Sequence, residues 1–424
     1  MEDYLLTGGM IYQNGQITRA DMEIKNGRIE NINNNINHKN LKKLDVSGCI
    51  ITPGFMDLHV HLRSPGFEYK ENIKTGTRAA AAGGYVMICA MPNLNPVPDS
   101  IENLRVELDL IEKDSCVKVL PYGAITKGEK GAELSDFDAL SPYVVGFSDD
   151  GRGVQDENMM LKAMKRVKEL NKFIAAHCED ESLLYKNWAV HDGILAKKFD
   201  LIGNRSESEW RQVERDLKLV EQTGCPYHVC HVSTKESVNL IREAKNRGLP
   251  VTCETGPHYL VLCDEDLQDD GRFKMNPPIR TKQDQEVLIA GLQDGVIDCI
   301  ATDHAPHSIQ EKSRGLKSSL NGIIGMETAF PVLYTRLVKP GVISLERLFN
   351  AMCVRPREIA GLPGGNLNTG ERADLAVLDL NLNYKINPDK FYSMGRSTPF
   401  DGWSVDAAVM MTIYNGEIVY QREK

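Results

Sequence analysis

The central part of the chain alternates short apolar runs with longer amphipathic segments. The apolar runs have strand-like composition, whereas the segments between them repeat apolar residues at a spacing close to 3.6. This alternation predicts strands that alternate with helices, and therefore a parallel sheet covered by helices. The predicted strands lie in 54–63, 84–93, 116–125, 143–151, 172–180, 226–234, 250–260 and 296–307. The clearest predicted helices lie in 100–114, 157–171, 208–224 and 234–248.

Eight strands that alternate with helices match the count that closes a (β/α)8 barrel. We therefore expect an α/β fold with a catalytic TIM-type barrel at 54–364, and a doubly wound open sheet is the competing architecture. The two flanks instead carry strand-like runs joined by Asn-Gly pairs, which are typical of β-hairpins. Each flank is too small for a core of its own. Residues 1–53 and 365–424 are therefore expected to pair into one β-sandwich domain beside the barrel.

Polar side chains fall at the carboxyl ends of the predicted strands. The stretch GFMDLHVHLRSPG spaces His59, His61 and Arg63 by two residues, so on a strand they would share one face. Unpaired buried polar groups are costly, so the two imidazoles predict a metal and the guanidinium predicts an anion. In a barrel the strand ends form one mouth, where active sites of this architecture lie. The other residues at predicted strand ends are Asn93, Asp150, His177, His231, Asp303 and His307.

Composition narrows the function. The net charge of -9 and the pI near 5.7 argue against nucleic acid as a partner but allow a small anionic substrate. The first residues do not resemble a signal peptide, and no apolar run approaches the roughly 18 residues that span a bilayer. Most of the ten cysteines lie in apolar runs without a CxxC pair, which favours reduced, buried thiols. A cytoplasmic enzyme fits these features.

Four histidines and two aspartates at the ends of predicted strands form a joint pattern that points to a metal, although any one of them alone would more often be structural. They suit zinc, and six side chains are enough for two neighbouring ions. His228 and His231 are three residues apart and would face opposite sides of a strand, so we take His231 as the ligand and His228 as structural. The remaining histidines are expected to support the site (His258, His304) or to lie at the surface (His38, His191).

Together the stretches DLHVHLRSPG, AMPN, GFSDDG, HCED, HVCHVST, KMNPP and IDCIATDHAPH resemble the class I dihydroorotases of the amidohydrolase superfamily. The resemblance runs through nearly the whole chain. It implies zinc-dependent, reversible hydrolysis of the cyclic amide of (S)-dihydroorotate to N-carbamoyl-L-aspartate in de novo pyrimidine (UMP) biosynthesis. It also implies two zinc ions per subunit, bridged by a carboxylate and a hydroxide.

The resemblance assigns roles to individual residues. His59, His61 and Asp303 would hold the more buried zinc, and His177 and His231 would hold the second. Asp150 would bridge the two ions, where many relatives, including hydantoinases, use a carbamylated lysine. Asp303 would also act as the general base. Arg63, Asn93 and His307 would bind the substrate carboxylate, and Asn276 with the backbone at Asn321-Gly322 would bind the ring amides. The residues expected to contact substrate are thus His61, Arg63, Asn93, Asn276, His307, Asn321 and Gly322.

Two positions depart from the family pattern: a Gly within CETGPHYL, and Asn321 where an apolar residue is more usual. Another cyclic ureide hydrolase, such as a hydantoinase or allantoinase, is the nearest alternative, and Arg63 and Asp150 argue against it. A silent scaffold that supports aspartate transcarbamoylase is a second, and the retention of all six ligands argues against that. A homodimer is expected, and association with aspartate transcarbamoylase is left open. The segment 303–322 has the composition of a mobile lid or of a plain solvated loop.

Overall fold

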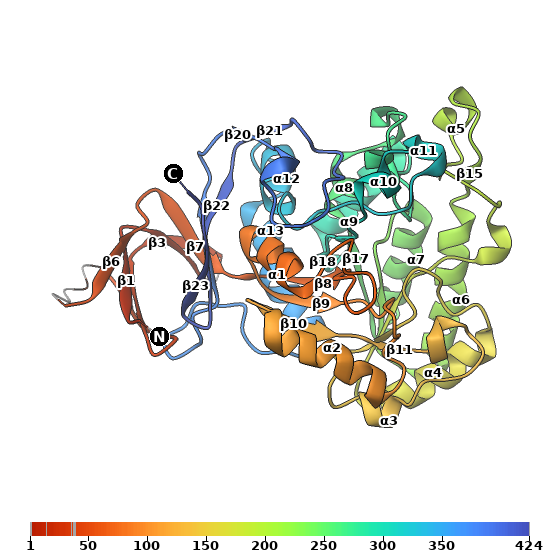
Figure 1. Ribbon diagram of the computed structural model, residues 1–424, viewed down its shortest axis with the longest axis horizontal. Coiled ribbons are helices and arrows are strands. Elements are labelled where there is room, and N and C mark those ends of the chain that lie inside the picture. Colours follow the sequence, from red (N-terminus) through yellow and green to blue (C-terminus); the bar gives the residue numbers. More distant parts are fainter. Residues whose placement is uncertain (1, 14, 35, 37–39, 424) are drawn as a thin grey trace.

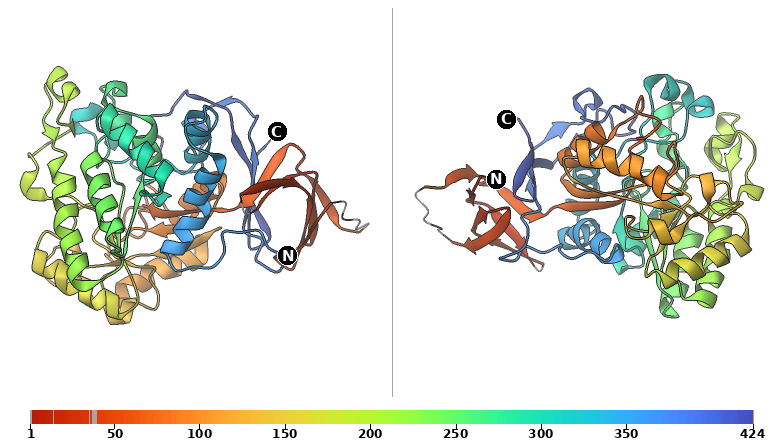
Figure 2. Two further views of the ribbon diagram at one scale, coloured as in Figure 1. Left: turned by 180° about the vertical axis from the view of Figure 1, so that it is seen from behind. Right: turned by 60° about the horizontal axis from the view of Figure 1, so that its bottom comes forward.

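The structure is a computed structural model that describes residues 2–13, 15–34, 36 and 40–423, so His38 lies outside the described residues. It is an α/β fold in which strands from both ends of the chain gather at one end of the molecule (Figure 1). The helices and the parallel strands make up the rest, as two further views show (Figure 2). Among the described residues, no helix combines the length and apolar character needed to cross a bilayer.

The parallel strands follow one another in sequence order through two sheets, β10-β9-β8 and β11-β12-β13-β16-β17-β18. The third predicted strand is split at Tyr122, whose N–H donates to the Ala90 carbonyl at 2.9 Å. Val60, at the end of β8, also pairs in parallel with His304, which lies just after β18. The first and last of the parallel strands are therefore neighbours. The bounds are β8 Phe55–Val60, β9 Tyr85–Ala90, β10 Lys118–Pro121, β11 Gly123–Ala124, β12 Phe147–Ser148, β13 Ile174–Ala176, β16 Tyr227–Val229, β17 Val251–Thr255 and β18 Cys299–Ile300.

The four clearest predicted helices are confirmed as α2, α4, α6 and α7. α4 illustrates why they form: Asp156 caps its N-terminus by accepting from Met159 N, and Met160, Ala163, Met164 and Val167 make one buried stripe. The long helices are α1 Ile73–Ala82, α2 Ile101–Asp114, α4 Glu157–Glu169, α6 Glu207–Thr223, α7 Lys235–Asn246 and α9 Lys282–Asp294. The short ones are α3 Phe137–Leu140, α5 Ile194–Lys198, α8 Pro257–Val261, α10 Ile309–Lys312, α11 Gly315–Ser318, α12 Ala329–Leu333, α13 Leu345–Phe349 and α14 Arg355–Ile359.

Strands from the two ends of the chain pair with one another, as expected. The six-stranded sheet β23-β22-β19-β7-β2-β3 mixes both flanks, and Leu6, Ile51 and Val377 share one apolar core. The predicted hairpin at Asn415-Gly416 has φ angles of 51° and 78°, the left-handed values of a tight hairpin turn. The domain limits at 53/54 and 364/365 stay a prediction. The flank strands are β1 Tyr4–Thr7, β2 Met10–Gln13, β3 Gln16–Arg19, β4 Asp21–Lys25, β5 Arg28–Asn33, β6 Lys42–Asp45, β7 Cys49–Pro53, β19 Leu375–Asp379, β20 Tyr384–Lys385, β21 Ser404–Val405, β22 Ala408–Tyr414 and β23 Glu417–Gln421.

An excursion that the sequence patterns did not predict lies between β13 and α6, and it carries α5 and the strand pair β14 Val190–His191 and β15 Gly203–Asn204. The expectation that His191 lies at the surface is wrong, because its side chain is buried and its Nδ1 accepts from Arg280 Nη1 at 3.3 Å. Burial and the charge of Arg280 lower the pKa of His191 to about 4. The cysteines in apolar runs are buried and free, as predicted: Cys89, Cys178, Cys230, Cys253 and Cys299.

Candidate active site

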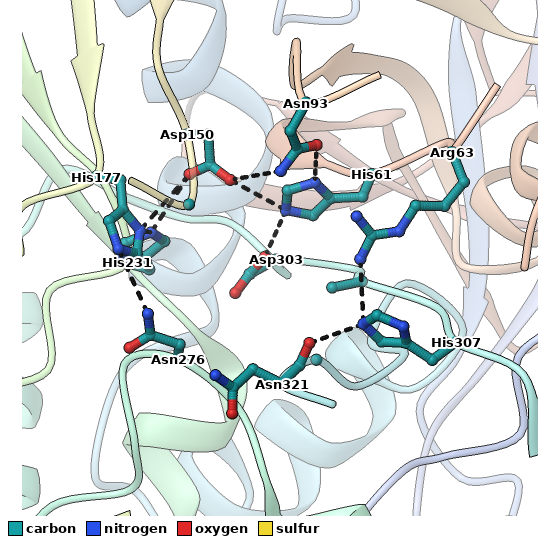
Figure 3. Close-up of a pocket in the computed structure, with 13 residues that line it drawn as sticks. His61, Arg63, Asn93, Asp150, His177, His231, Asn276, Asp303, His307 and Asn321 are labelled. Atoms are coloured by element: carbon teal, nitrogen blue, oxygen red, sulfur yellow. Dashed lines mark hydrogen bonds and ion pairs between the residues drawn. The ribbon is translucent and has the colours of Figure 1, made fainter. Parts of the chain in front are cut away.

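The predicted site residues converge on one pocket at the carboxyl ends of the parallel strands (Figure 3). Its volume is about 200 Å³, and of the residues predicted to act there only His59 does not line it. His59 lies beneath the pocket with no exposed surface. The lining residues are His61, Arg63, Asn93, Asp150, Gly151, His177, His231, Asn276, Asp303, Ala305, His307, Asn321 and Gly322.

The expectation that His61 and Arg63 continue the strand of His59 is wrong, because β8 ends at Val60. Arg63 instead reaches the pocket from a left-handed backbone conformation with φ of 59°. His231 and Asp303 also have positive φ, at 35° and 47°. Such conformations are uncommon for residues other than glycine and cost about 1–3 kcal/mol each. Three strained residues around one pocket indicate that the surrounding structure holds these side chains in place for a purpose other than stability.

Glu254, on β17, fixes the orientation of the His59 ring. His59 Nδ1 donates to Glu254 Oε1 at 2.9 Å, so in the neutral ring Nε2 carries the lone pair. That Nε2 lies 3.3 Å from Asp150 Oδ1, and neither atom has a hydrogen-bond partner among the described residues. Two buried acceptors that face each other need a cation between them. Although burial lowers it, the carboxylates of Asp150 and Glu254 raise the pKa of His59 well above its ordinary value, so without a metal a proton on Nε2 would be that cation, and a metal would have to replace it.

Asn93 fixes His61 in the same way. The Asn93 amide donates through Nδ2 to Asp150 Oδ2 at 3.3 Å, which turns its Oδ1 toward His61 Nδ1 at 2.9 Å. His61 Nε2 therefore presents its lone pair to Asp303 Oδ1 at 3.1 Å, a second pair of acceptors in contact. Although burial raises them, the neighbouring histidines hold the pKa values of Asp150 and Asp303 below their ordinary range. Both carboxylates are thus ionised at neutral pH.

His177 and His231 meet on the other side of Asp150. His177 Nδ1 lies 3.0 Å from His231 Nε2, and these two atoms lie 3.8 Å and 3.7 Å from Asp150 Oδ1. The Asp150 carboxylate is therefore shared between the His59–His61 pair and the His177–His231 pair. Glu179 lies behind His177, with its Oε2 3.5 Å from His177 Nε2.

The donor set fits divalent metal ions. Four imidazoles and two carboxylates suit zinc and its neighbours in the first transition row. Two compact groups of buried ligand atoms share His59: one includes Asp150 and His231, and the other includes His61 and Asp303. The division of ligands between two ions stays a prediction, and Asp150 lies between the His59–His61 pair and the His177–His231 pair.

Arg63 and His307 form a separate, cationic side of the pocket, across Asp303 from His177 and His231 in Figure 3. Arg63 Nε donates to the Pro306 carbonyl at 3.2 Å, and its Nη2 lies 3.5 Å from His307 Nε2. Gly322 lies beside this side with φ of 134°, and a Cβ there would lie 2.6 Å from the Ala305 carbonyl oxygen, so only glycine fits. His307 and Gly322 belong to the segment 303–322, which folds into α10 and α11 and buries Leu316 in the core.

The remaining predicted residues lie around the same centre. His228 takes the structural role expected for it, with its Nδ1 2.8 Å from Thr252 Oγ1 and its Nε2 3.1 Å from Glu254 Oε2. His258 and His304 are buried. The sequence analysis missed Glu254 and Glu179, and the signal that could have found Glu254 is a carboxylate within the apolar run VTCET.

Comparisons with known proteins identify the family of this chain. A family model described as dihydro-orotase-like matches residues 48–237. The chain is 48% identical over 424 residues to the dihydroorotase of Bacillus cytotoxicus, with 99% of each chain covered. It is 47% identical, with the same coverage, to the dihydroorotase of Bacillus cereus strain AH820. Among solved structures, the L-hydantoinase (dihydropyrimidinase) from Arthrobacter aurescens is similar, with a TM-score of 0.89, 25% identity, and coverage of 100% of this chain and 97% of that one. A D-hydantoinase shares the fold, with a TM-score of 0.86, 23% identity, and coverage of 99% and 95%. The full-length identity to curated dihydroorotases shows that this chain is an enzyme of the dihydroorotase family.

Proposed function

We propose that this pocket hydrolyses the ring amide of (S)-dihydroorotate to N-carbamoyl-L-aspartate, reversibly, with two zinc ions bound to each chain. The observation that carries the proposal is the contact of His59 Nε2 with Asp150 Oδ1, neither of which has a hydrogen-bond partner among the described residues, in a site that also holds the partly buried Arg63 guanidinium. The first feature calls for a metal, and the second calls for a substrate that carries a carboxylate. A cyclic amide with a ring carboxylate satisfies both.

The ligands would be divided as their positions suggest. His59, His61 and Asp303 would hold one ion, His177 and His231 the other, and Asp150 would contribute to both. When bound, the ions would polarise the ring carbonyl and make the attacking water more acidic. Zinc is proposed because the donor set combines imidazoles with carboxylates.

Asp303 would move the proton in this reaction. Its carboxylate is ionised and lines the pocket, so it can take one proton from water as the water oxygen attacks the carbonyl carbon. The bond between that carbon and the ring nitrogen then breaks, and Asp303 returns the proton to the nitrogen. The ring opens to a carboxylic acid and a ureido group, the acid releases its remaining proton to solvent and becomes a carboxylate, and Asp303 ends in its starting protonation state.

Two amide side chains support recognition of the ring. Asn276 Nδ2 donates to Glu179 Oε2 at 3.0 Å, which leaves Asn276 Oδ1 without a partner among the described residues. Asn321 Oδ1 is likewise buried without one. These oxygens can accept only, so they would pair with the N–H groups of a cyclic ureide. Arg63 and His307 would hold the substrate carboxylate, with the remaining Nδ2 hydrogen of Asn93 close by.

A hydantoinase activity is the competing function, since hydantoinases share the fold. The pocket favours dihydroorotate because Arg63 is partly buried and has no ion pair among the described residues, so a substrate without a carboxylate would leave its charge unpaired. The residues that line the described pocket also include no lysine, and Asp150 occupies the position between the two histidine pairs.

Metal analysis and a substrate comparison test the proposal. Wild-type protein should contain two zinc ions per chain and turn over dihydroorotate much faster than hydantoin. His177→Ala should bind at most one zinc and lose activity, and His59→Ala should lose activity and most of the metal, because no other imidazole can replace either ligand. Thermal unfolding with and without zinc separates lost metal from lost fold. Full activity in either variant, or faster turnover of hydantoin, would reject the assignment.

The closed barrel, the domain limits, the oligomeric state and the cellular location are proposals as well. We propose that the sequential parallel strands and the contact between Val60 and His304 make a closed (β/α)8 barrel at 54–364, flanked by a β-sandwich built from 1–53 and 365–424. A homodimer and a cytoplasmic location are also proposed, and association with aspartate transcarbamoylase is left to a binding experiment.

A further inference from the structure

Lys70 lies in the loop between β8 and α1, outside the pocket, and nothing above gives it a role. Its ammonium lies 3.2 Å from His307 Nδ1 and 3.1 Å from Glu311 Oε1. The side chain is only 12% exposed, so a long cation has been largely removed from water. Placing a lysine there costs desolvation and side-chain entropy, and the two contacts must offset that cost.

The contact with His307 has only one direction. An ammonium has donors and no acceptor, so Lys70 donates and His307 Nδ1 accepts. The His307 proton is then on Nε2, which donates to the Asn321 carbonyl at 2.8 Å. The opposite tautomer would give Nδ1 a proton to share with Glu311 Oε2 at 3.5 Å, but it would set two acceptors against each other at Asn321. Lys70 and the Asn321 carbonyl therefore favour the same ring form, in which the single N–H is on Nε2, the atom that lies 3.5 Å from Arg63 Nη2.

Charge around His307 keeps the ring neutral. Burial and the positive charges of Arg63 and Lys70 lower the pKa of His307 to about 3. The ring itself therefore contributes a hydrogen-bond donor rather than a charge at neutral pH.

Glu311 holds Lys70 in place and ties it to the segment that carries His307. Glu311 lies on α10, where Ser308 N donates to its Oε2 at 2.9 Å, and Tyr69 donates to its Oε1 at 3.2 Å. The loop after β8 is thus joined to the segment 303–322 through the partly buried ion pair of Lys70 and Glu311.

We propose that Lys70 is a positioning residue for binding of the substrate carboxylate: it holds His307 as the Nε2–H tautomer, so that a bound carboxylate next to Arg63 can compete with the Asn321 carbonyl for that N–H. The inference rests on the proposed function, because it assumes that this side of the pocket binds a carboxylate. Lys70 itself does not touch the substrate and acts through His307.

Kinetics of three variants test the inference. Lys70→Met removes the donor, Lys70→Arg keeps a donor-only cation, and Lys74→Met removes an equal charge from an exposed site four residues away on α1. Lys70→Met should raise KM for dihydroorotate about tenfold or more, the scale of one lost hydrogen bond to a charged group, with a smaller change in kcat. Lys70→Arg should recover most of this loss, and Lys74→Met should stay within twofold of wild type. Turnover of 5,6-dihydrouracil, which lacks the carboxylate, should not change, whereas a merely structural role would affect both substrates equally.

A spectroscopic measurement separates this inference from the proposed function. The ¹⁵N shifts of the His307 ring, assigned by comparison with His307→Gln, should report the Nε2–H tautomer in wild type and a loss of that preference in Lys70→Met. If wild type fails to hydrolyse dihydroorotate, the proposed function is wrong and the tautomer measurement still decides the role of Lys70. An unchanged tautomer, or an equal loss for both substrates, would overturn the inference.

Discussion

Glu254→Gln is the change that most directly tests whether His59 is a metal ligand. Glu254 has no exposed surface and accepts from His59 Nδ1 at 2.9 Å and from His228 Nε2 at 3.1 Å. Although burial raises it, hydrogen bonds from these two histidines lower the pKa of Glu254 below its ordinary value, so the group is a carboxylate. Glutamine keeps the size but offers one accepting oxygen and one donating nitrogen, so it cannot accept from both rings.

The size of the effect follows from what His59 would lose. Without a carboxylate behind it, the His59 ring can place its proton on Nε2, the atom that faces Asp150 Oδ1. A proton on that atom competes with a metal. Loss of such an outer partner typically weakens metal binding by about 10–100-fold. At about 1.4 kcal/mol per factor of ten, this corresponds to roughly 1.4–2.8 kcal/mol of binding free energy.

The assay is competition for zinc between the protein and a chromophoric chelator at fixed pH. The matched control is Glu107→Gln, which makes the same substitution at another buried glutamate, on α2 and outside the pocket. Glu254→Gln should shift the zinc dissociation constant upward and recover activity as zinc is added, and Glu107→Gln should not shift it. Wild-type affinity in Glu254→Gln would refute the reasoning, because His59 would then need no fixed tautomer to bind the metal.

Three further predictions test other parts of the site. Arg63→Met should lose about 3 kcal/mol of transition-state binding for dihydroorotate, the scale for truncating one partner of a desolvated charge pair, and Arg63→Lys should also be impaired because an ammonium cannot make the paired contact. The check is kcat/KM for dihydroorotate and 5,6-dihydrouracil, and an equal loss for both would make Arg63 structural. Asp303→Asn should keep its circular dichroism spectrum and lose about 10²–10⁴-fold in kcat, because an amide cannot take the proton, and activity within a few-fold of wild type would exclude the base role. Glu107 has no hydrogen-bond partner among the described residues, and burial raises its pKa well above 4.5, so its ionisation favours the unfolded chain. The stability of Glu107→Gln relative to wild type should therefore rise above pH 4.5, by up to about 1.4 kcal/mol per pH unit, in urea unfolding measured at several pH values. A difference that does not vary with pH would show that Glu107 finds a partner in solution.

The alternation of strands and helices could be predicted because each helix must bury one stripe and each parallel strand is apolar on both faces. The grouping of polar residues at strand ends could also be predicted, because an apolar strand ends where polar residues such as His177 and His231 begin. The path beyond the strand could not be predicted. Alternation placed Arg63 on the strand of His59, but β8 ends at Val60 and a left-handed turn brings Arg63 to the pocket. Such a turn depends on tertiary contacts, here the bond from Arg63 Nε to the Pro306 carbonyl.

The partners that orient the site residues could not be predicted from the sequence either. His59 and Glu254 are 195 residues apart, and Lys70 and His307 are 237 residues apart. No local pattern links such pairs, because they meet only through the order of the strands and the folding of the segment 303–322. The Gly within CETGPHYL is a similar case: a Cβ at Gly256 would lie 2.4 Å from His258 Cε1, so the departure from the family pattern follows from packing beside His258.

Substrate choice in this enzyme must reside in the side chains around the pocket rather than in the fold. A TM-score of 0.89 to an L-hydantoinase shows that the same backbone arrangement carries a hydrolase with a different name and only 25% identity. The histidines and aspartates on one side of the pocket would, as proposed, hold the metal ions that hydrolysis of any cyclic amide requires. On the other side, Lys70 is paired with Glu311 and His307 is neutral, so Arg63 supplies the positive charge that an anionic substrate would balance. If Arg63 holds the substrate carboxylate as proposed, a substrate without one would leave this charge unpaired, so the site would select by rejection as well as by attraction.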